Sequence, residues 1–136
     1  MIRIDGLEFA YGSGAAVLEN LDLELPSGLA LLLGPNGCGK STLLKLMAGV
    51  EHPAAGRVGI AGYDLWKDEV AARRHLAYVP EHPDLSPYAT IREILALVSG
   101  LRGGDQCEAG EALEWVGLAG LGDRTVRELS LSLIHI

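Results

Sequence analysis

Apolar and polar residues alternate twice near the start of the chain, in residues 2–10 and again in residues 20–25. A period of two is typical of half-buried β-strands, which place successive side chains on opposite faces of a sheet. Gly6 interrupts the first segment and predicts a bend there. Tyr11 begins a short loop of small residues between the two segments. The pattern therefore predicts antiparallel strands at the start of the chain.

Two other segments, residues 30–33 and 76–79, are short and almost wholly apolar. Such runs are typical of strands that are buried on both faces of a parallel sheet. The first run precedes a glycine-rich loop and then apolar residues at helical spacing, which predict a helix that ends near Gly49. Early antiparallel strands followed by strand, loop and helix predict a mixed α/β architecture rather than a plain doubly wound sheet.

The rest of the chain predicts one more short strand and three helices. Residues 57–60 are expected to form the strand and residues 65–74 the first of these helices. Three prolines in residues 80–87 rule out a helix interior in that segment. Thr90 and Glu93 then form a T-x-x-E capping box, which predicts the start of a second helix. A third helix follows Asp105.

Composition narrows the class of protein. The chain has 136 residues, of which 49% are hydrophobic and 21% charged, as in a soluble globular domain. A net charge of −7 argues against a broad nucleic-acid-binding surface, so no nucleic-acid partner is expected. Two cysteines suggest no disulfide framework and favour a reducing cytoplasm. No apolar run is long enough for a membrane span, so a partner would have to supply one.

The stretch GPNGCGKST, which starts at Gly34, fits the pattern G-x-x-x-x-G-K-[ST] of a phosphate-binding loop. Gly34, Gly37 and Gly39 allow backbone conformations that a side chain would forbid, so successive N–H groups can point at phosphate oxygens. Lys40 adds a compact positive charge for the β- and γ-phosphates, and Ser41 offers a hydroxyl to Mg²⁺. The strand expected before the loop and the helix expected after it are the context that this motif needs.

Several strings together carry a resemblance to a known family. In chain order they are FAYGSG, LLLGPNGCGKST, AGRVGIAGYDL, LAYVPEHPDL, ATIREIL and RTVRELS. This ordered set resembles the nucleotide-binding subunit of an ABC transporter over residues 1–130. The implied fold is α/β: the ABC ATPase core of a P-loop NTPase, with an antiparallel β subdomain and the start of a helical subdomain, incomplete.

The resemblance also implies ligands and site residues. The family binds ATP with Mg²⁺, and its A-loop aromatic, which corresponds to Tyr11, stacks on adenine. Cys38 is expected to be a tolerated small residue of the loop rather than a reactive group. The implied ATP-binding residues are Tyr11, Gly34, Pro35, Asn36, Gly37, Cys38, Gly39, Lys40, Ser41 and Thr42.

Glu81 departs from the family pattern, which usually has Gln at this Q-loop position, where it contacts Mg²⁺ and the attacking water. The string YVPE resembles that of exporters of the multidrug, sodium and gliding-motility type. A carboxylate is a hard oxygen ligand that suits Mg²⁺. We therefore expect Glu81 to act with Lys40 in catalysis and with Ser41 on the metal. The alternative is that Glu81 is a solvated acid of the loop.

The C-terminal sequence is a second departure. After Ser130 the family continues the LSGGQ signature, whereas this chain reads LSLIHI over residues 131–136. The string corresponds to a one-frame translation of a transposon end, CTG TCT CTT ATA CAC ATC. We expect residues 131–136 to be a non-native tail from a truncated gene model; a genuine divergent tail is the alternative. The chain as given would then lack the family's Walker B motif and catalytic Glu.

The function implied by the resemblance is ATP hydrolysis that drives transport through a transmembrane permease subunit. A second ATP-binding subunit would complete each site head to tail, and the protein would be cytoplasmic, peripheral on the inner face of the membrane. One alternative is a nucleotide-binding fragment without turnover, which is what the chain as given should be. Another is a different P-loop NTPase, such as a kinase or GTPase.

Overall fold

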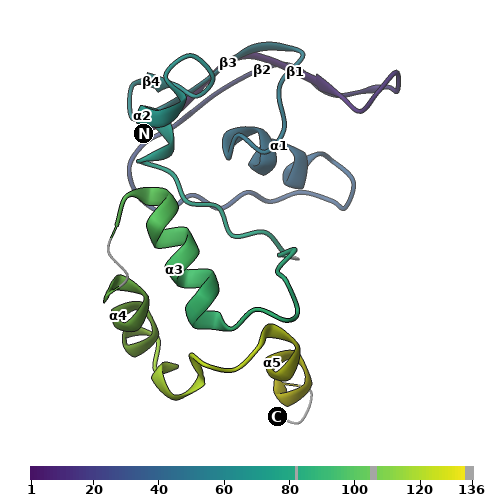
Figure 1. Ribbon diagram of the computed structural model, residues 1–136. Helices are drawn as coiled ribbons and strands as arrows, with labels where there is room; N and C mark the ends of the chain where they lie inside the picture. The colour runs from purple at the N-terminus through teal and green to yellow at the C-terminus, as the bar shows by residue number, and fades with distance from the viewer. Residues whose placement is uncertain (82, 105–106, 134–136) are drawn as a thin grey trace. The chain divides into compact units, whose positions relative to one another are not determined.

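The computed structural model describes residues 1–81, 83–104 and 107–133, which form two compact units, Met1–Val79 and Pro80–Ile136 (Figure 1). The first unit holds the sheet and two helices, and the second holds the remaining helices. Within the described residues, no helix is both long enough and apolar enough to cross a membrane.

The sheet of the first unit has four antiparallel strands in the order β2-β1-β3-β4. These are β1 (Ile2–Ala10), β2 (Ala16–Leu25), β3 (Ala55–Ile60) and β4 (Tyr63–Asp64). The register of β1 against β2 is irregular between Ile4 and Leu7, where Gly6 has a φ of 56°. The predicted antiparallel pairing is therefore confirmed, but Gly6 marks an irregularity within one continuous strand rather than a bend between two strands.

The apolar face of this sheet packs against helix α1 (Lys40–Met47), as Figure 1 shows. Burying each large aliphatic side chain stabilises the fold by about 1.5–3 kcal/mol. The core therefore fixes the start of α1, where the phosphate loop ends, against strands β1 and β3. Its buried members are Ile4, Leu7, Phe9, Leu43, Leu46, Met47, Val58, Ile60, Leu65 and Ala72.

The prediction of buried parallel strands at residues 30–33 and 76–79 is wrong. Neither segment belongs to a strand, and Leu31, Leu33 and Val79 are 80%, 77% and 89% exposed. The physical reason is the backbone ladder. A parallel strand needs a neighbour that accepts and donates its hydrogen bonds, and the described sheet consists of antiparallel pairs that include neither segment.

Helix α2 (Glu69–Arg73) is shorter than the helix predicted over residues 65–74. The Asp64 side chain explains the late start, because its Oδ1 accepts the backbone N–H groups of Trp66 and Lys67, both at 3.0 Å. An Asp that captures nearby N–H groups in this way favours a turn over a helix. The predicted strand 57–60 is confirmed and begins two residues earlier.

The second unit contains α3 (Ile91–Arg102), α4 (Cys107–Trp115), a 3₁₀ turn η1 (Ala119–Leu121) and α5 (Val126–Leu133). The capping box predicted for α3 is confirmed: Thr90 Oγ1 accepts the Glu93 N–H at 3.2 Å, and Glu93 Oε2 accepts the Thr90 N–H at 2.8 Å. Of the expected tail, residues 134–136 lie outside the described residues, as does Asp105 before α4.

Candidate functional site

The phosphate loop connects the exposed segment at residues 29–33 to α1, and two of its glycines have a left-handed backbone. Gly37 has a φ of 82° and Gly39 a φ of 90°, which side-chain-bearing residues rarely adopt. Gly34 does not share this conformation. A Cβ on Gly34 would stand 2.8 Å from Cys38 Sγ, the end of an exposed side chain, so either Cys38 or the loop would have to shift.

Lys40 folds back over the loop that precedes it. Its Nζ donates to the carbonyl oxygens of Gly34 and Pro35 at 2.8 and 2.7 Å, and lies 3.9 Å from Cys38 Sγ. The ammonium group therefore closes the loop around itself and concentrates positive charge there. An ammonium has three donors, and the third points at the weak acceptor Cys38 Sγ, which the oxygen of an incoming anion could replace.

The start of α1 offers further donors. Gly39 is the N-cap and contributes no side-chain oxygen, and the first turn of α1 has no acidic residue. The N–H groups of a helix's first turn lack intrahelical acceptors and carry the positive end of the helix dipole. Together with the Lys40 ammonium, they make this loop suited to bind an anionic group such as phosphate.

Tyr11 lies beside the first turn of α1, although it is far from that helix in the sequence. Its hydroxyl is 3.3 Å from Thr42 Oγ1. The ring stands edge-on to Phe9, with a centroid distance of 4.8 Å and an interplanar angle of 89°. The Gly14 N–H donates to the Tyr11 carbonyl at 3.1 Å. The structure thus brings Tyr11 to the phosphate loop and leaves half of its surface exposed.

The remaining loop residues are accessible. Pro35, Asn36, Cys38 and Ser41 are all exposed. In the described residues no group of three or more His, Cys, Asp or Glu side chains could hold a metal ion. The Ser41 hydroxyl, next to Lys40, is a hard oxygen ligand of the kind that Mg²⁺ accepts together with phosphate oxygens and water. These residues therefore fit a magnesium ion that arrives with a nucleotide.

Glu81 belongs to the unit Pro80–Ile136, whereas Lys40 and Ser41 belong to Met1–Val79. Glu81 is exposed to solvent. Its expected role on the metal joins two separate units and stays a prediction. His82, the next residue, lies outside the described residues.

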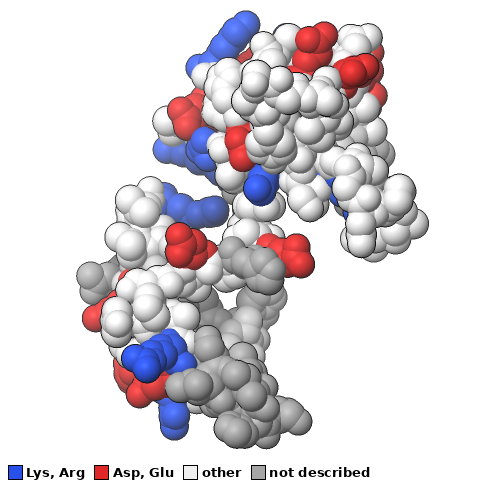
Figure 2. Space-filling view, turned by 90° about the vertical axis from the view of Figure 1, so that its right-hand side faces the viewer, with Lys and Arg blue, Asp and Glu red and all other residues white. Residues whose placement is uncertain are grey.

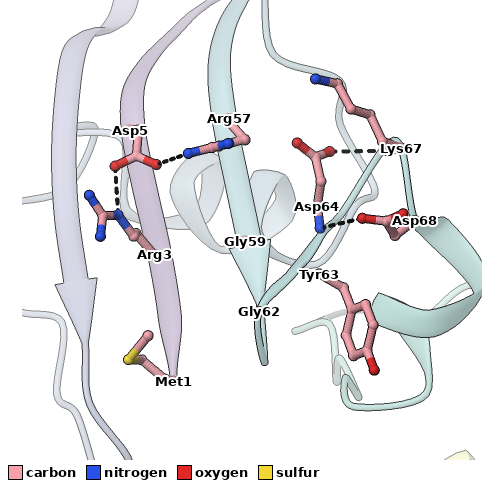
Figure 3. A pocket seen from close by; sticks show the side chains of 10 residues that line it. All are labelled: Met1, Arg3, Asp5, Arg57, Gly59, Gly62, Tyr63, Asp64, Lys67 and Asp68. Carbon is pink, nitrogen blue, oxygen red and sulfur yellow. Dashed lines mark hydrogen bonds and ion pairs between the residues drawn. The ribbon is translucent and has the colours of Figure 1, made fainter.

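A hollow of about 360 Å³, which no sequence motif predicted, lies on the outer face of the sheet (Figure 3). Asp5 is central to it, because Arg3 Nε donates to Asp5 Oδ1 at 2.8 Å and Arg57 Nη2 donates to Asp5 Oδ2 at 2.9 Å. The hydrogen bonds from Arg3 and then Arg57 lower the pKa of Asp5. The lining residues are Met1, Arg3, Asp5, Arg57, Gly59, Gly62, Tyr63, Asp64, Lys67 and Asp68.

Most charged side chains of this hollow form hydrogen bonds or ion pairs with other groups of the protein. Asp64 accepts two backbone N–H groups, as described above, and Asp68 Oδ2 accepts the Asp64 N–H at 3.1 Å. Lys67 adds a positive charge at the rim, so the lining carries three basic and three acidic side chains. We interpret the hollow as a surface of the sheet on which acidic and basic side chains pair with one another. Acidic and basic side chains are likewise interspersed over the face in Figure 2.

Comparison with known proteins gives the family context. A family model described as "ABC transporter" matches residues 18–133. The sulfate/thiosulfate import ATP-binding protein CysA of Thermosynechococcus vestitus is 40% identical over 134 residues, which cover 95% of this chain and 39% of that protein. The Fe(3+) ions import ATP-binding protein FbpC of Brucella abortus is 42% identical, with 95% and 37% covered. The chain thus spans about two fifths of these relatives.

Solved structures agree. A chain described as "Structure of ATP binding subunit of ABC transporter" matches with a TM-score of 0.72 and 27% identity, over 91% of this chain and 53% of that one. A putative ABC transporter ATP-binding protein from Pyrococcus furiosus matches with a TM-score of 0.69 and 25% identity, over 93% and 62%. The family match decides against the kinase or GTPase alternative.

These relatives do not support the expectation of an exporter, which was drawn from the string YVPE at residues 78–81. Both CysA and FbpC are described as import proteins. A single exchanged residue in a four-residue string carries too little information to separate transport directions. The agreement over most of the chain outweighs it.

Proposed function

The chain belongs to the ABC transporter family and has part of the ABC ATPase fold, and we propose that its phosphate loop binds Mg-ATP. The observation that carries the proposal is the geometry of the loop. Two left-handed glycines precede a helix whose N-cap supplies no side-chain acceptor, and the Lys40 ammonium lies at the loop carbonyls. Backbone N–H groups and one lysine are the donors that a triphosphate needs.

We assign the phosphate contacts to the loop and the base contact to Tyr11. The edge-on contact with Phe9 holds the Tyr11 ring in place while half of the residue stays exposed. An aromatic face of this kind can stack on adenine, which is worth about 1–3 kcal/mol per base. Ser41 would hold Mg²⁺ together with phosphate oxygens, and a role for the Glu81 carboxylate as a further oxygen ligand of Mg²⁺ stays a prediction.

We further propose that the full assembly couples ATP hydrolysis to transport at the inner face of the membrane. Its partners would be a transmembrane permease subunit and a second ATP-binding subunit. The import proteins among the relatives support an importer, with an inorganic ion as the class of cargo. We further propose that residues 1–130 are the N-terminal part of an ATP-binding domain and that residues 131–136 are non-native.

We propose that the 136-residue chain alone binds nucleotide without steady turnover. Catalysis in phosphoryl transfer depends on positioning and charge stabilisation. Lys40 and Ser41 can supply part of the charge stabilisation. The family's water-polarising Glu follows its Walker B motif, and none of the site residues proposed above takes that role. A positioned general base typically contributes about two to four orders of magnitude to the rate.

The test is Mg-ATP binding by isothermal titration to the parent chain, to Lys40→Ala and to Lys67→Ala. Lys67 is the matched control, because it lies at the outer hollow of the sheet rather than at the loop. We expect Lys40→Ala to lose at least tenfold in affinity and Lys67→Ala to bind like the parent. Equal affinity of the parent and Lys40→Ala would overturn the assignment of the phosphate loop.

A further inference from the structure

The contact between Tyr11 and Thr42 connects the proposed base-binding residue to the phosphate loop. Thr42 is only 7% exposed, and a buried hydroxyl needs a hydrogen-bond partner. Tyr11 supplies one, at 3.3 Å. We propose that the Tyr11 hydroxyl orients the Thr42 hydroxyl toward the phosphates, so that Tyr11 is a positioning residue for the triphosphate as well as a platform for the base. This inference rests on the proposed function.

The direction of the hydrogen bonds follows from the inventory of donors. A phosphate oxygen is an acceptor, so Thr42 can help to bind it only by donating its single hydroxyl proton. The Thr42 oxygen must then accept from Tyr11, which has a phenolic proton to give. The order is Tyr11 O–H to Thr42 Oγ1, then Thr42 O–H to the phosphate. Consecutive hydrogen bonds of this kind strengthen one another.

The structure around Tyr11 makes the two roles compatible. Stacking uses the face of the ring, whereas the contact with Thr42 uses the hydroxyl at its edge. The ring is held edge-on by Phe9, and the backbone is held by the turn that Gly14 closes on the Tyr11 carbonyl. The hydroxyl is therefore kept near the first turn of α1 whether or not a base covers the ring.

The distance sets the size of the expected effect. At 3.3 Å the contact is longer than the usual 2.5–3.0 Å between hydroxyl oxygens. Hydrogen bonds at binding sites are often long without ligand and shorten in the complex. A neutral hydrogen bond at the weaker end of the usual range corresponds to a loss of about two- to fivefold in affinity when its donor is removed.

The experiment is a double-mutant cycle on the full 136-residue chain, with Tyr11→Phe, Thr42→Val and the double variant. Phe keeps the ring and removes the hydroxyl, and Val keeps the shape of Thr42. The ligand is inorganic triphosphate with Mg²⁺, because it has no base and reports on the phosphate contacts alone. We expect Tyr11→Phe to weaken binding about two- to fivefold in the parent and to have no effect in the Thr42→Val background.

Thr42→Ser provides the conservative control, since it retains the hydroxyl and should preserve the effect of Tyr11→Phe. Equal losses from Tyr11→Phe in the parent and Thr42→Val backgrounds would overturn the inference. So would a lowered melting temperature in Tyr11→Phe with unchanged affinity for triphosphate, because the contact would then only tie β1 to α1. Failure of the proposed function looks different: triphosphate binding would be insensitive to Lys40→Ala.

Discussion

Gly39 offers a quantitative test of how the phosphate loop is built. Its φ of 90° disfavours any side chain, and a Cβ there would stand 3.2 Å from Val17 Cγ1. Left-handed backbone costs a non-glycine residue about 1–2 kcal/mol, and the contact with Val17 adds to it. We expect Gly39→Ala to lower the free energy of unfolding by about 2 kcal/mol. Because the same strain displaces the loop backbone, affinity for Mg-ATP should also fall by at least tenfold.

Two other glycines serve as controls, one for backbone strain without a steric contact and one for strain outside the loop. Gly37 has a φ of 82° and Gly62 a φ of 91°, and a Cβ on either would have no atom within 4 Å. Gly37→Ala therefore introduces strain alone within the loop, and Gly62→Ala introduces it in the β3–β4 turn. Urea unfolding and Mg-ATP titration should show a stability loss in all three, but an affinity loss only in the two loop variants. An equal affinity loss in Gly62→Ala would refute the reasoning.

Three further results are expected. Tyr11→Ala should weaken ATP much more than inorganic triphosphate, as measured by titration, because it removes the stacking face as well as the hydroxyl; equal losses would make its role structural. Thr90→Ala should lower stability in urea by about 1 kcal/mol, since it removes the cap of α3. The pKa of Asp5 is lowered, so its contribution to stability is complete above the unfolded value near 3.8 and is lost as pH falls through the folded pKa. Asp5→Asn should therefore reduce the fall in melting temperature at acidic pH. An unchanged fall would contradict the pairing with Arg3 and Arg57.

Local patterns predicted the parts of the fold that depend on neighbouring residues. Alternation in β1 was informative because one face of the strand is buried, where Ile4 and Leu7 pack. The capping box at Thr90 could likewise be predicted, since all of its atoms lie within four consecutive residues. The same is true of the phosphate loop, whose glycine spacing is set by its own backbone.

Long-range partners explain what the sequence could not predict. The apolar runs 30–33 and 76–79 have strand composition, but strand formation depends on a distant ladder partner. The contact of Tyr11 with Thr42 joins residues 31 positions apart. The outer hollow exists because the antiparallel register pairs Asp5 with Arg57 across β1 and β3. None of these follows from local periodicity.

The most direct test of the central claim is a ¹H–¹⁵N NMR titration of the 136-residue chain with Mg-ATP. The phosphate loop and the outer hollow of the sheet make different predictions for it. If the loop binds the triphosphate, the amide signals of Gly37, Gly39 and Lys40 should shift with saturation, and adenosine alone should move them little. Shifts confined to Arg57 and Gly59 at the outer face of the sheet, with the loop amides unmoved, would contradict the account.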